Sequence, residues 1–522
     1  MNNPRGPAVE PRSAHPLIYE INTWVWLNEL SRRHGKLITL ANVPDAEWQS
    51  IADLGFDTVW LMGVWERSPA GVQIAREHGP FQEEFPRVLP GYNPDEDLVG
   101  SPYCVRRYRV DEHLGGPNGL AGARTKLAAR GLRLILDFVP NHVAPDHPWA
   151  SEHPEYFIRG SEEDLAADPA AYFKIGDNIL ARGKDPFFPP WPEVAQLNAF
   201  DPGLRQAVIA TLNDIATQCD GVRCDMAMLL TTPVVIRTWG ERAGAPLENE
   251  YWRKVIPAVK ARHPGFLFIA EAYWDLEWEL QQQGFDYCYD KRLYDRLIHD
   301  DARAIRGHLQ ADPSYQQKLL LFIENHDEPR AAATFSPEKE RAAAVTFSTL
   351  PGARLFYDGQ LDGRKVRLPV LLGRQPEEAP DVELRDYQER LLRTISAAQI
   401  GVGEWRLCGT SGWPDNQSHE NLVAWCWRNA EHRALVVVNL SDGAAQGIVW
   451  LPWEDLEGAI WRLEDGLSSA TFERDGGDLV SSGVFVALDR WGTHLFQTHQ
   501  AQVESRAEHG ELAATAMDSQ GA

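Results

Sequence analysis

The sequence of 522 residues has no long apolar run and no recognisable export signal. Its richest apolar stretch, residues 434–440, is far shorter than the roughly 18 residues that a bilayer-spanning helix needs. The first residues, MNNPRGPAVEPRSAHP, lack the apolar core of a secretory signal. We therefore expect a protein without a membrane partner that stays in the cytoplasm.

An excess of basic residues is also missing. The chain has 51 Lys and Arg against 75 Asp and Glu, which gives a formal net charge of -24. Nucleic acids and anionic membranes select basic surfaces, so this balance argues against both as partners. An acidic surface mainly keeps a protein soluble and identifies no partner by itself.

Cysteine is sparse and tryptophan is abundant. The six cysteines follow no metal-ligand spacing, and we interpret them as reduced, mostly buried thiols. The 19 tryptophans are more informative, because a flat indole suits core packing and also the stacking of sugar rings. We expect most of them in the core and a minority at a ligand.

Several stretches repeat one order: a cap, an amphipathic helix, a glycine and a short apolar strand. Asp201 with Pro202, for example, begins a helix that leads through Gly221 into a strand. The candidate strands are residues 17–22, 58–64, 132–139, 222–225, 266–270, 285–289, 319–324 and 354–357. Alternating helices and apolar strands predict a parallel sheet covered by helices, and eight strands close a (β/α)8 barrel. The alternative, an open doubly wound sheet, lacks a glycine-rich phosphate loop after its first strand.

Two segments break this order. Residues 143–200 are rich in Pro, Asp and aromatics, which indicates a short inserted subdomain after the third strand. From residue 404 to 499 short alternating strands predict a C-terminal antiparallel β-sandwich domain. The barrel would then occupy residues 16–403, between a flexible N-terminus (1–15) and a disordered tail (500–522).

Polar residues follow the barrel strands at their C-terminal ends, where barrel enzymes place their sites. Arg223 and Asp225 are two apart, so both side chains point to the same face of an extended strand. The polar residues at these strand ends are Asp137, Asn141, His142, Arg223, Asp225, Glu271, Asn325, His326 and Asp327. We expect the carboxyl groups of Asp225, Glu271 and Asp327 to converge at one mouth of the barrel.

These three carboxyl groups suit the cleavage of a glycosidic bond. One carboxylate attacks the anomeric carbon, a protonated carboxyl group donates to the departing oxygen, and a third can bind hydroxyls. We expect Arg223 to lower the pKa of Asp225, and crowding by carboxylates to raise the pKa of Glu271. His142 and His326 can donate hydrogen bonds to sugar hydroxyls.

Any one of these residues alone is more often part of a structural hydrogen-bond network, but four segments in order are specific. LILDFVPNH, GVRCDMAM, FIAEAYW and FIENHDEPR resemble the four sequence regions of the α-amylase family of glycoside hydrolases. The resemblance covers about residues 17 to 400. It implies that Asp225 is the nucleophile, Glu271 the acid/base and Asp327 the stabiliser of the transition state.

The resemblance also implies substrate-binding residues. PYCVRRY is similar to the segment whose tyrosine, here Tyr103, stacks under the cleaved glucose. His142, Arg223 and His326 match sugar-binding or nucleophile-supporting positions of the family. Asn141 matches a calcium ligand, but Gln196 stands where an aspartate is common, so a structural calcium ion stays an open alternative to a hydrogen-bonded loop. The chemistry itself requires no cofactor.

We therefore predict a retaining α-glycoside hydrolase that acts on an α-glucan or a maltooligosaccharide. An α-glucan transglycosylase is the first alternative, because the apolar run at 226–230 could line an acceptor site that holds less water. A catalytically inactive barrel that binds glucan or a protein partner is a second. A sugar-nucleotide or phosphate enzyme is a third, with Arg364, Lys365 and Arg367 as the nearest basic cluster, although a solvated charged loop explains that cluster better.

Overall fold

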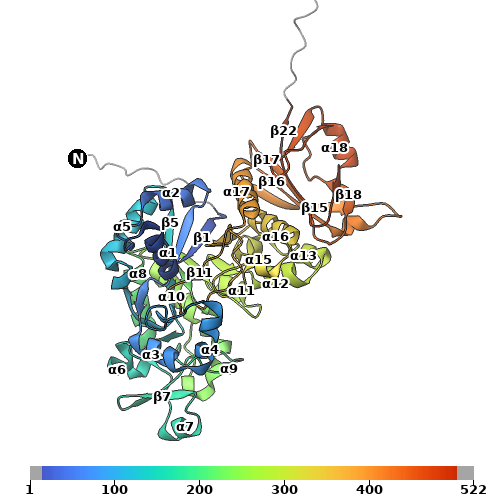
Figure 1. Cartoon of the computed structure of the whole chain (residues 1–522). Helices are drawn as coiled ribbons and strands as arrows, with labels where there is room; N and C mark the ends of the chain where they lie inside the picture. The colour runs from blue at the N-terminus through green and yellow to red at the C-terminus, as the bar shows by residue number, and fades with distance from the viewer. Residues whose placement is uncertain (1–13, 502–522) are drawn as a thin grey trace, which may run out of the picture.

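The computed structural model describes residues 14–501. Apart from their innermost residues, the predicted flexible N-terminus (1–15) and disordered tail (500–522) lie outside the described residues. Figure 1 shows a helix-covered barrel and, beside it, a smaller domain formed by the last strands of the chain. In the described part, no helix combines the length and the apolar character that membrane crossing requires.

Eight parallel strands close the barrel in the order β1-β14-β13-β12-β11-β10-β5-β2. They are β1 (Leu17–Asn22), β2 (Thr58–Met62), β5 (Arg133–Phe138), β10 (Gly221–Cys224), β11 (Leu267–Ala270), β12 (Tyr287–Tyr289), β13 (Leu319–Leu321) and β14 (Ala353–Tyr357). Each coincides with one of the eight predicted strands to within a few residues. The prediction of a (β/α)8 barrel is confirmed.

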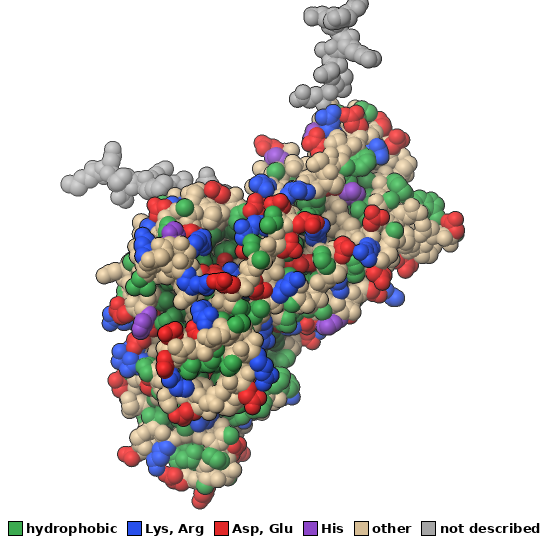
Figure 2. Space-filling model, viewed as in Figure 1, with side chains coloured by type: hydrophobic (Ala, Val, Ile, Leu, Met, Phe, Trp, Pro, Cys, Tyr) green, Lys and Arg blue, Asp and Glu red, His purple; other side chains and the backbone are tan. Residues whose placement is uncertain are grey.

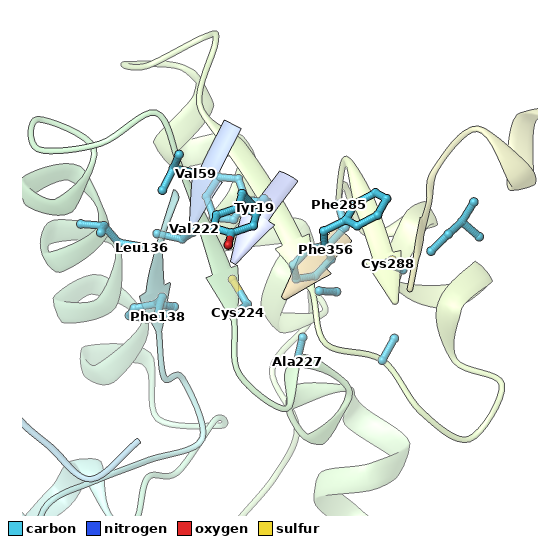
Figure 3. Close-up of a cluster of buried hydrophobic side chains, with 14 of the residues drawn as sticks. Tyr19, Val59, Leu136, Phe138, Val222, Cys224, Ala227, Phe285, Cys288 and Phe356 are labelled. Carbon is cyan, nitrogen blue, oxygen red and sulfur yellow. The ribbon is translucent and has the colours of Figure 1, made fainter. Parts of the chain in front are cut away.

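Alternate residues of each strand face the helices or the interior of the barrel, as the period of a strand requires. The outward side chains join the main core beneath the helices, and Figure 3 labels Tyr19, Val59, Leu136, Phe138, Val222, Cys224, Cys288 and Phe356 among them, together with Ala227 and Phe285 from adjoining segments. A separate inner cluster includes Ile18, Trp60, Met62, Ile135, Ile269, Tyr289, Leu320 and Leu355. Arg223 alternates with Val222 and Cys224, so it belongs to the inner set.

Helices surround the barrel, and α8 begins at its predicted capping residue. Asp201 accepts a hydrogen bond from the Leu204 amide at 2.7 Å and starts this helix. Beginning with the first half of the chain, the helices are α1 (Thr23–His34), α2 (Asp45–Asp53), α3 (Pro69–Glu77), α4 (Gly79–Val88), α5 (Gly116–Ala128) and α8 (Pro202–Ile215). They continue with α9 (Thr232–Trp239), α10 (Tyr251–Lys260), α11 (Glu277–Gln282), α12 (Lys291–His299), α13 (Ala302–His308), α14 (Pro313–Gln316), α15 (Ala331–Thr334), α16 (Pro337–Thr349) and α17 (Val382–Ala397).

Short elements fill the connections at the mouth of the barrel. Between β2 and α5, β3 (Trp65–Arg67) pairs with β4 (Val105–Val110). Between β5 and α8 lie β6 (His142–Val143), α6 (Trp149–Glu152), α7 (Glu162–Ala167), β7 (Tyr172–Ile175), β8 (Asn178–Ala181) and β9 (Ala195–Gln196). β6 pairs with β9 and sets His142 opposite Gln196, which ties the end of this inserted segment to its beginning.

The C-terminal domain is one curled antiparallel sheet of order β20-β19-β22-β17-β16-β15-β18-β21. Its strands are β15 (Glu404–Ser411), β16 (Leu422–Arg428), β17 (Arg433–Asn439), β18 (Ala445–Trp450), β19 (Ile460–Asp465), β20 (Thr471–Asp475), β21 (Val484–Leu488) and β22 (Thr493–Gln500), with α18 (Gly476–Ser482). β15 joins the two halves because it pairs with β16 along one part and with β18 along the other. The predicted antiparallel domain is confirmed, and its layers are parts of one continuous sheet around a shared apolar core.

The sequence did not reveal β15, β19 and β20. Every residue of β20 (TFERD) is exposed, so this edge strand has no apolar alternation to detect. All six cysteines are buried and free, in agreement with their interpretation as buried thiols.

Candidate active site

A cavity of about 570 Å³ lies at the C-terminal ends of the barrel strands. Eight residues were predicted to act in catalysis, substrate binding or calcium binding. Five of them line the cavity: Tyr103, His142, Asp225, Glu271 and Asp327. Arg223 and His326 are buried directly behind these groups, where they contact the carboxylates. Asn141 is buried as well but does not line the cavity. The expected convergence of three carboxyl groups is therefore present in the structure.

The guanidinium group of Arg223 links the three carboxylates. It donates to Oδ1 of Asp225 at 2.7 Å, lies 2.8 Å from Oε2 of Glu271, and is 4.0 Å from Oδ2 of Asp327. The aromatic rings of Trp60, Tyr103 and Tyr289 surround it, with centroids 5.2 to 5.6 Å from its central carbon. A buried cation in this position offsets the desolvation of the acidic groups around it.

The backbone fixes Asp225 and Glu271 at the ends of adjacent strands. The amide of Asp225 donates to the Phe138 carbonyl at 2.8 Å, and that of Glu271 donates to the Cys224 carbonyl at 3.1 Å. Met226, directly after Asp225, has a left-handed φ of 43°. Its amide thereby reaches Oε2 of Glu271 at 2.5 Å. A strained conformation at a non-glycine residue is typical of functional sites, where the surrounding structure enforces it.

Burial gives Glu271 the protonation state that a proton donor needs. It raises the pKa of Glu271 to about 7, against the opposing effect of Arg223. Burial also raises the pKa of Asp225 above its usual value, and Arg223 only limits the rise. Arg223 lowers the pKa of Asp225 as predicted, but burial outweighs it, and the sequence does not show how deeply the carboxyl group is buried.

Asp327 belongs to a chain of hydrogen bonds that reaches into the barrel. Nε2 of His326 lies 2.9 Å from Oδ2 of Asp327 and 2.5 Å from the hydroxyl of Tyr103, while its Nδ1 lies 2.5 Å from Oε1 of Glu20. Burial opposes ionisation of His326, but Asp327 and Glu20 outweigh it and raise the pKa to about 10. Burial would raise the pKa of Asp327, and the charged His326 instead lowers it to about 2.

Glu20 is a site residue that the sequence analysis did not identify. It lies on β1, is fully buried, and contacts His326 across 306 positions of the chain. A single acidic residue inside the apolar strand LIYEIN is its only signal in the sequence. An ionisable side chain in a buried strand needs a partner, so this position could have been marked as paired but not assigned to His326.

His142 stays neutral, because burial lowers its pKa to about 3. Its ring packs against Trp191, with ring centroids 5.1 Å apart. A neutral imidazole carries one donor and one acceptor, which suits a hydrogen bond with a sugar hydroxyl.

The predicted calcium ligand Asn141 already has a protein partner. Its side-chain oxygen accepts from Nε2 of Gln196 at 2.9 Å, and its side-chain nitrogen donates to Oε1 of Gln196 at 3.2 Å. Within residues 14–501, no group of three or more His, Cys, Asp or Glu side chains is placed to hold a metal ion. Calcium takes about six to eight oxygen ligands. The neutral amide pair does not fit this requirement, because each amide satisfies the other.

Aromatic side chains complete the cavity, and the sequence analysis did not single them out. Phe188, Trp191 and Tyr273 line it. Phe187, beside Phe188, meets Trp274 from the loop after Glu271, with ring centroids 4.8 Å apart. Two sequence features could have identified this lining: the run FFPPW at 187–191 and the aromatic residues that follow Glu271. Several aromatics in a proline-rich loop indicate a binding surface.

Comparison with known proteins also points to the alpha-amylase family. The family model for the alpha-amylase catalytic domain matches residues 47–366. The chain is 29% identical over 250 residues to alpha-amylase MalA of Haloarcula japonica, covering 46% of this chain and 33% of that protein. It therefore spans about a third of the length of that relative.

Two further curated relatives match more of the chain. Alpha-amylase 3 of Dictyoglomus thermophilum is 22% identical over 402 residues, covering 73% of this chain and 70% of that protein. The alpha-1,4-glucan:maltose-1-phosphate maltosyltransferase of Rhodospirillum rubrum is 25% identical over 491 residues, covering 89% and 63%.

Among solved structures, the fold matches the alpha-amylase of Geobacillus thermoleovorans complexed with acarbose. The TM-score is 0.65 at 17% identity, covering 94% of this chain and 99% of that one. An alpha-amylase from Lactobacillus plantarum gives a TM-score of 0.62 at 20% identity, covering 93% and 99%. With more than half of its residues matched by the family model, this chain belongs to the alpha-amylase family of glycoside hydrolases.

Proposed function

We propose that the protein cleaves α-linked glucose oligosaccharides or polysaccharides by double displacement, with retention of the α configuration. The single observation that carries this proposal is the Arg223 bridge between Asp225 and Glu271. Retaining enzymes hold two carboxyl groups about 5 to 5.5 Å apart, and inverting enzymes about 6.5 to 9.5 Å. Two carboxylates bound by one guanidinium group are close neighbours, which favours the retaining arrangement.

In the first step the carboxylate of Asp225 attacks the anomeric carbon, and the bond from that carbon to the glycosidic oxygen breaks. Glu271, with its pKa of about 7, gives its proton to the departing oxygen. The sugar is then an ester of Asp225, and Glu271 is ionised. The ionised Asp327 beside the ring stabilises the positive charge that develops in the transition state.

In the second step Glu271 takes a proton from water, and the water oxygen attacks the anomeric carbon. The ester bond breaks, the carboxylate of Asp225 is restored, and Glu271 regains its proton. Two inversions at one carbon leave the product in the α configuration.

The cavity offers contacts that suit a glucose ring. Tyr103 presents an aromatic ring, and its hydroxyl group is held by His326. The aromatic side chains of Phe188 and Trp191 can cover the apolar faces of further sugars. These contacts support an α-glucan or a maltooligosaccharide as the substrate.

The configuration of the first product tests the proposal. Proton NMR during the first minutes of maltooligosaccharide hydrolysis should show the α-anomer before mutarotation produces the β-anomer. Initial release of the β-anomer would refute double displacement through Asp225.

Transfer to a sugar acceptor is the second candidate. It is favoured by the similarity to a maltosyltransferase over 89% of this chain and by the aromatic lining of the cavity. The apolar run at 226–230 contributes less than the sequence suggested. Met226 lines the cavity, whereas residues 227–230 form a buried turn in the main core. Products longer than a single maltooligosaccharide substrate would identify transfer, and exclusively shorter products would identify hydrolysis.

The two other classes find less support. A catalytically inactive barrel would not need three carboxyl groups and a proton donor of raised pKa at one cavity. For a sugar-nucleotide or phosphate enzyme, one member of the nearest basic cluster is already engaged, because Arg364 pairs with Glu29 at 3.0 Å.

A further inference from the structure

The outward face of the C-terminal sheet carries exposed aromatic side chains. Phe485 on β21 is 54% exposed, Trp450 on β18 is 41% exposed, and Trp413, just after β15, is 38% exposed. Ile448 pairs with Phe485, and Gly409 pairs with Trp450, so these residues share one face of the sheet. We call Trp413, Ile448, Trp450 and Phe485 the aromatic strip. Figure 2 shows hydrophobic side chains exposed in the outer part of this domain.

The indole of Trp450 lies against two glycines of the sheet, Gly409 and Gly483. A β-carbon at Gly409 would lie 3.9 Å from this ring, and one at Gly483 would lie 3.4 Å from it. The indole Nε1 donates to the hydroxyl of Ser411 at 2.9 Å. Aromatic rings often cover a glycine on the neighbouring strand, and here the ring still remains 41% exposed. Trp450 is thus held in place with part of its surface available to a ligand.

The other rings of the strip are positioned as well. The ring centroids of Trp413 and Phe485 are 6.1 Å apart, and their planes are inclined by 58°. Two reciprocal backbone hydrogen bonds between Trp413 and Asn416, of 3.2 and 3.0 Å, close the turn that carries Trp413. Rings held in this way lose little conformational entropy when they bind a ligand.

A polar hollow of about 450 Å³ continues the strip, and its lining includes Asn416, Ser418, Gln446 and Asp489. Gln446 and Trp450 lie on the same face of β18, four residues and therefore roughly 13 Å apart. Amide and hydroxyl groups thus lie on the same face of the sheet as the aromatic rings. Asp489 is the charged group among these side chains, although the whole chain has a net charge of -24.

We propose that the aromatic strip and the adjoining hollow form a second binding site for α-glucan chains, distinct from the catalytic cavity. The choice of glucan rests on the proposed function. Pyranose rings stack their C–H faces on aromatic side chains, and their hydroxyl groups pair with amides and hydroxyls. The carboxylates of Asp489 and of the exposed Asp415, in the turn that carries Trp413, can accept hydrogen bonds from sugar hydroxyls and, with the net charge of -24, disfavour nucleic acid or anionic lipid. The site shares no lining residue with the catalytic cavity.

The site would hold the enzyme on a polymer while the barrel acts on accessible chain ends or segments. Its loss should therefore affect binding and turnover of polysaccharides but not of short substrates. This separation of effects distinguishes the site from a purely structural aromatic cluster.

The test compares the double variant Trp450→Ala/Phe485→Ala with Phe472→Ala. Phe472, on β20 of the same domain, is 37% exposed but lies outside the aromatic strip. Each change is introduced into an Asp225→Asn background so that the polymer is not degraded, and migration is measured in native gels with and without amylopectin. We expect the double variant to bind the polymer about 5- to 100-fold more weakly, as two lost stacking contacts imply. The Phe472→Ala control should match its parent.

The same changes in the active enzyme complete the test. Turnover of a chromogenic maltotrioside should be unaffected, and activity on amylopectin should fall. Phe485→Ala alone changes a largely exposed residue, so it tests the site if the double variant does not fold. Unchanged retardation of a folded variant would overturn the proposal. The proposal would also be overturned if the parent protein self-associates and the double variant is monomeric, because the strip would then be an interface between copies of the chain. If amylopectin retards the parent protein in the gel but the protein with Asp225 intact turns over no glucan, the second site is supported and the proposed function is rejected.

Discussion

The barrel mouth and the junction with the inserted segment both bury polar side chains, but they do so in different ways. At the mouth, Asp225, Glu271 and Asp327 surround one guanidinium group, and their pKa values are shifted. At the junction, Asn141 and Gln196 form a neutral amide pair in which each group satisfies the other. Charged groups with shifted pKa values can exchange protons or bind an ionic transition state, whereas a satisfied neutral pair can only hold the chain together.

The largest effect should come from removing a carboxylate at the mouth. Asp225→Asn and Glu271→Gln should each lower kcat by about 10²- to 10⁴-fold or more, because one removes the nucleophile and the other the acid. The matched control is Glu340→Gln on α16, whose carboxyl group is also buried and has its pKa raised to about 8. Activity equal to wild type in either mouth variant would contradict the catalytic role of that carboxyl group. An equal loss in the control would show that removing any buried carboxyl group has this effect.

The pH dependence of kcat/KM should reflect the same charged groups. Glu271 must be protonated to donate, so kcat/KM should fall about tenfold per unit as the pH rises beyond a pKa of about 7. On the acidic side Asp225 must be ionised, and its raised pKa places that decline above the usual 3.8. A profile that stays flat from about pH 6 to 9 would contradict the role of Glu271 as the acid.

Glu20→Gln should weaken the charged chain without touching the substrate. Loss of a charge-assisted hydrogen bond of about 1.5 to 3 kcal/mol should lower kcat roughly 10- to 100-fold. His326 has a folded pKa of about 10 against the usual 6.5, so its stabilising contribution is complete below pH 6.5 and is lost as the pH rises to 10. Thermal unfolding across this range should show a smaller alkaline loss in the variant. An unchanged loss would show that Glu20 does not hold the charge on His326.

At the neutral junction the effect should be on stability and not on chemistry. Gln196→Ala removes hydrogen bonds to Asn141 and Leu197 and should lower the free energy of unfolding by about 1 to 3 kcal/mol. The exposed Gln49→Ala is the control. EDTA should leave the unfolding midpoint of the parent unchanged, and a rise in the midpoint with added calcium would show that the amide pair opens to hold an ion.

The smallest effect should come from the aromatic rim of the cavity. Phe188 is 67% exposed and lines the cavity, so Phe188→Ala should raise KM for longer maltooligosaccharides about 2- to 10-fold, as one stacking contact implies. Leu37→Ala, at a residue that is 75% exposed and does not line the cavity, should change nothing. A large fall in kcat in the Phe188 variant would mean that the rim also contributes to the chemical step at the carboxylates.

Most of the barrel could be predicted from the sequence, because glycine-punctuated helices and period-two strands are local signals. Arg223 and Asp225 were placed on one face by their spacing alone. Glu20 could not be linked to His326, since its partner is 306 positions away. The net shift of the Asp225 pKa depends on burial, which strand spacing does not reveal. β20 was missed because an exposed edge strand has no apolar pattern.

Trapping the glycosyl-enzyme would show which carboxyl group is the nucleophile. Glu271→Gln, treated with an activated fluorosugar of the α-glucosyl series and digested with protease, should yield one modified peptide by mass spectrometry. The sugar should be attached to the carboxyl group of Asp225. Attachment to another carboxyl group, or no adduct although the activated substrate is consumed, would contradict it.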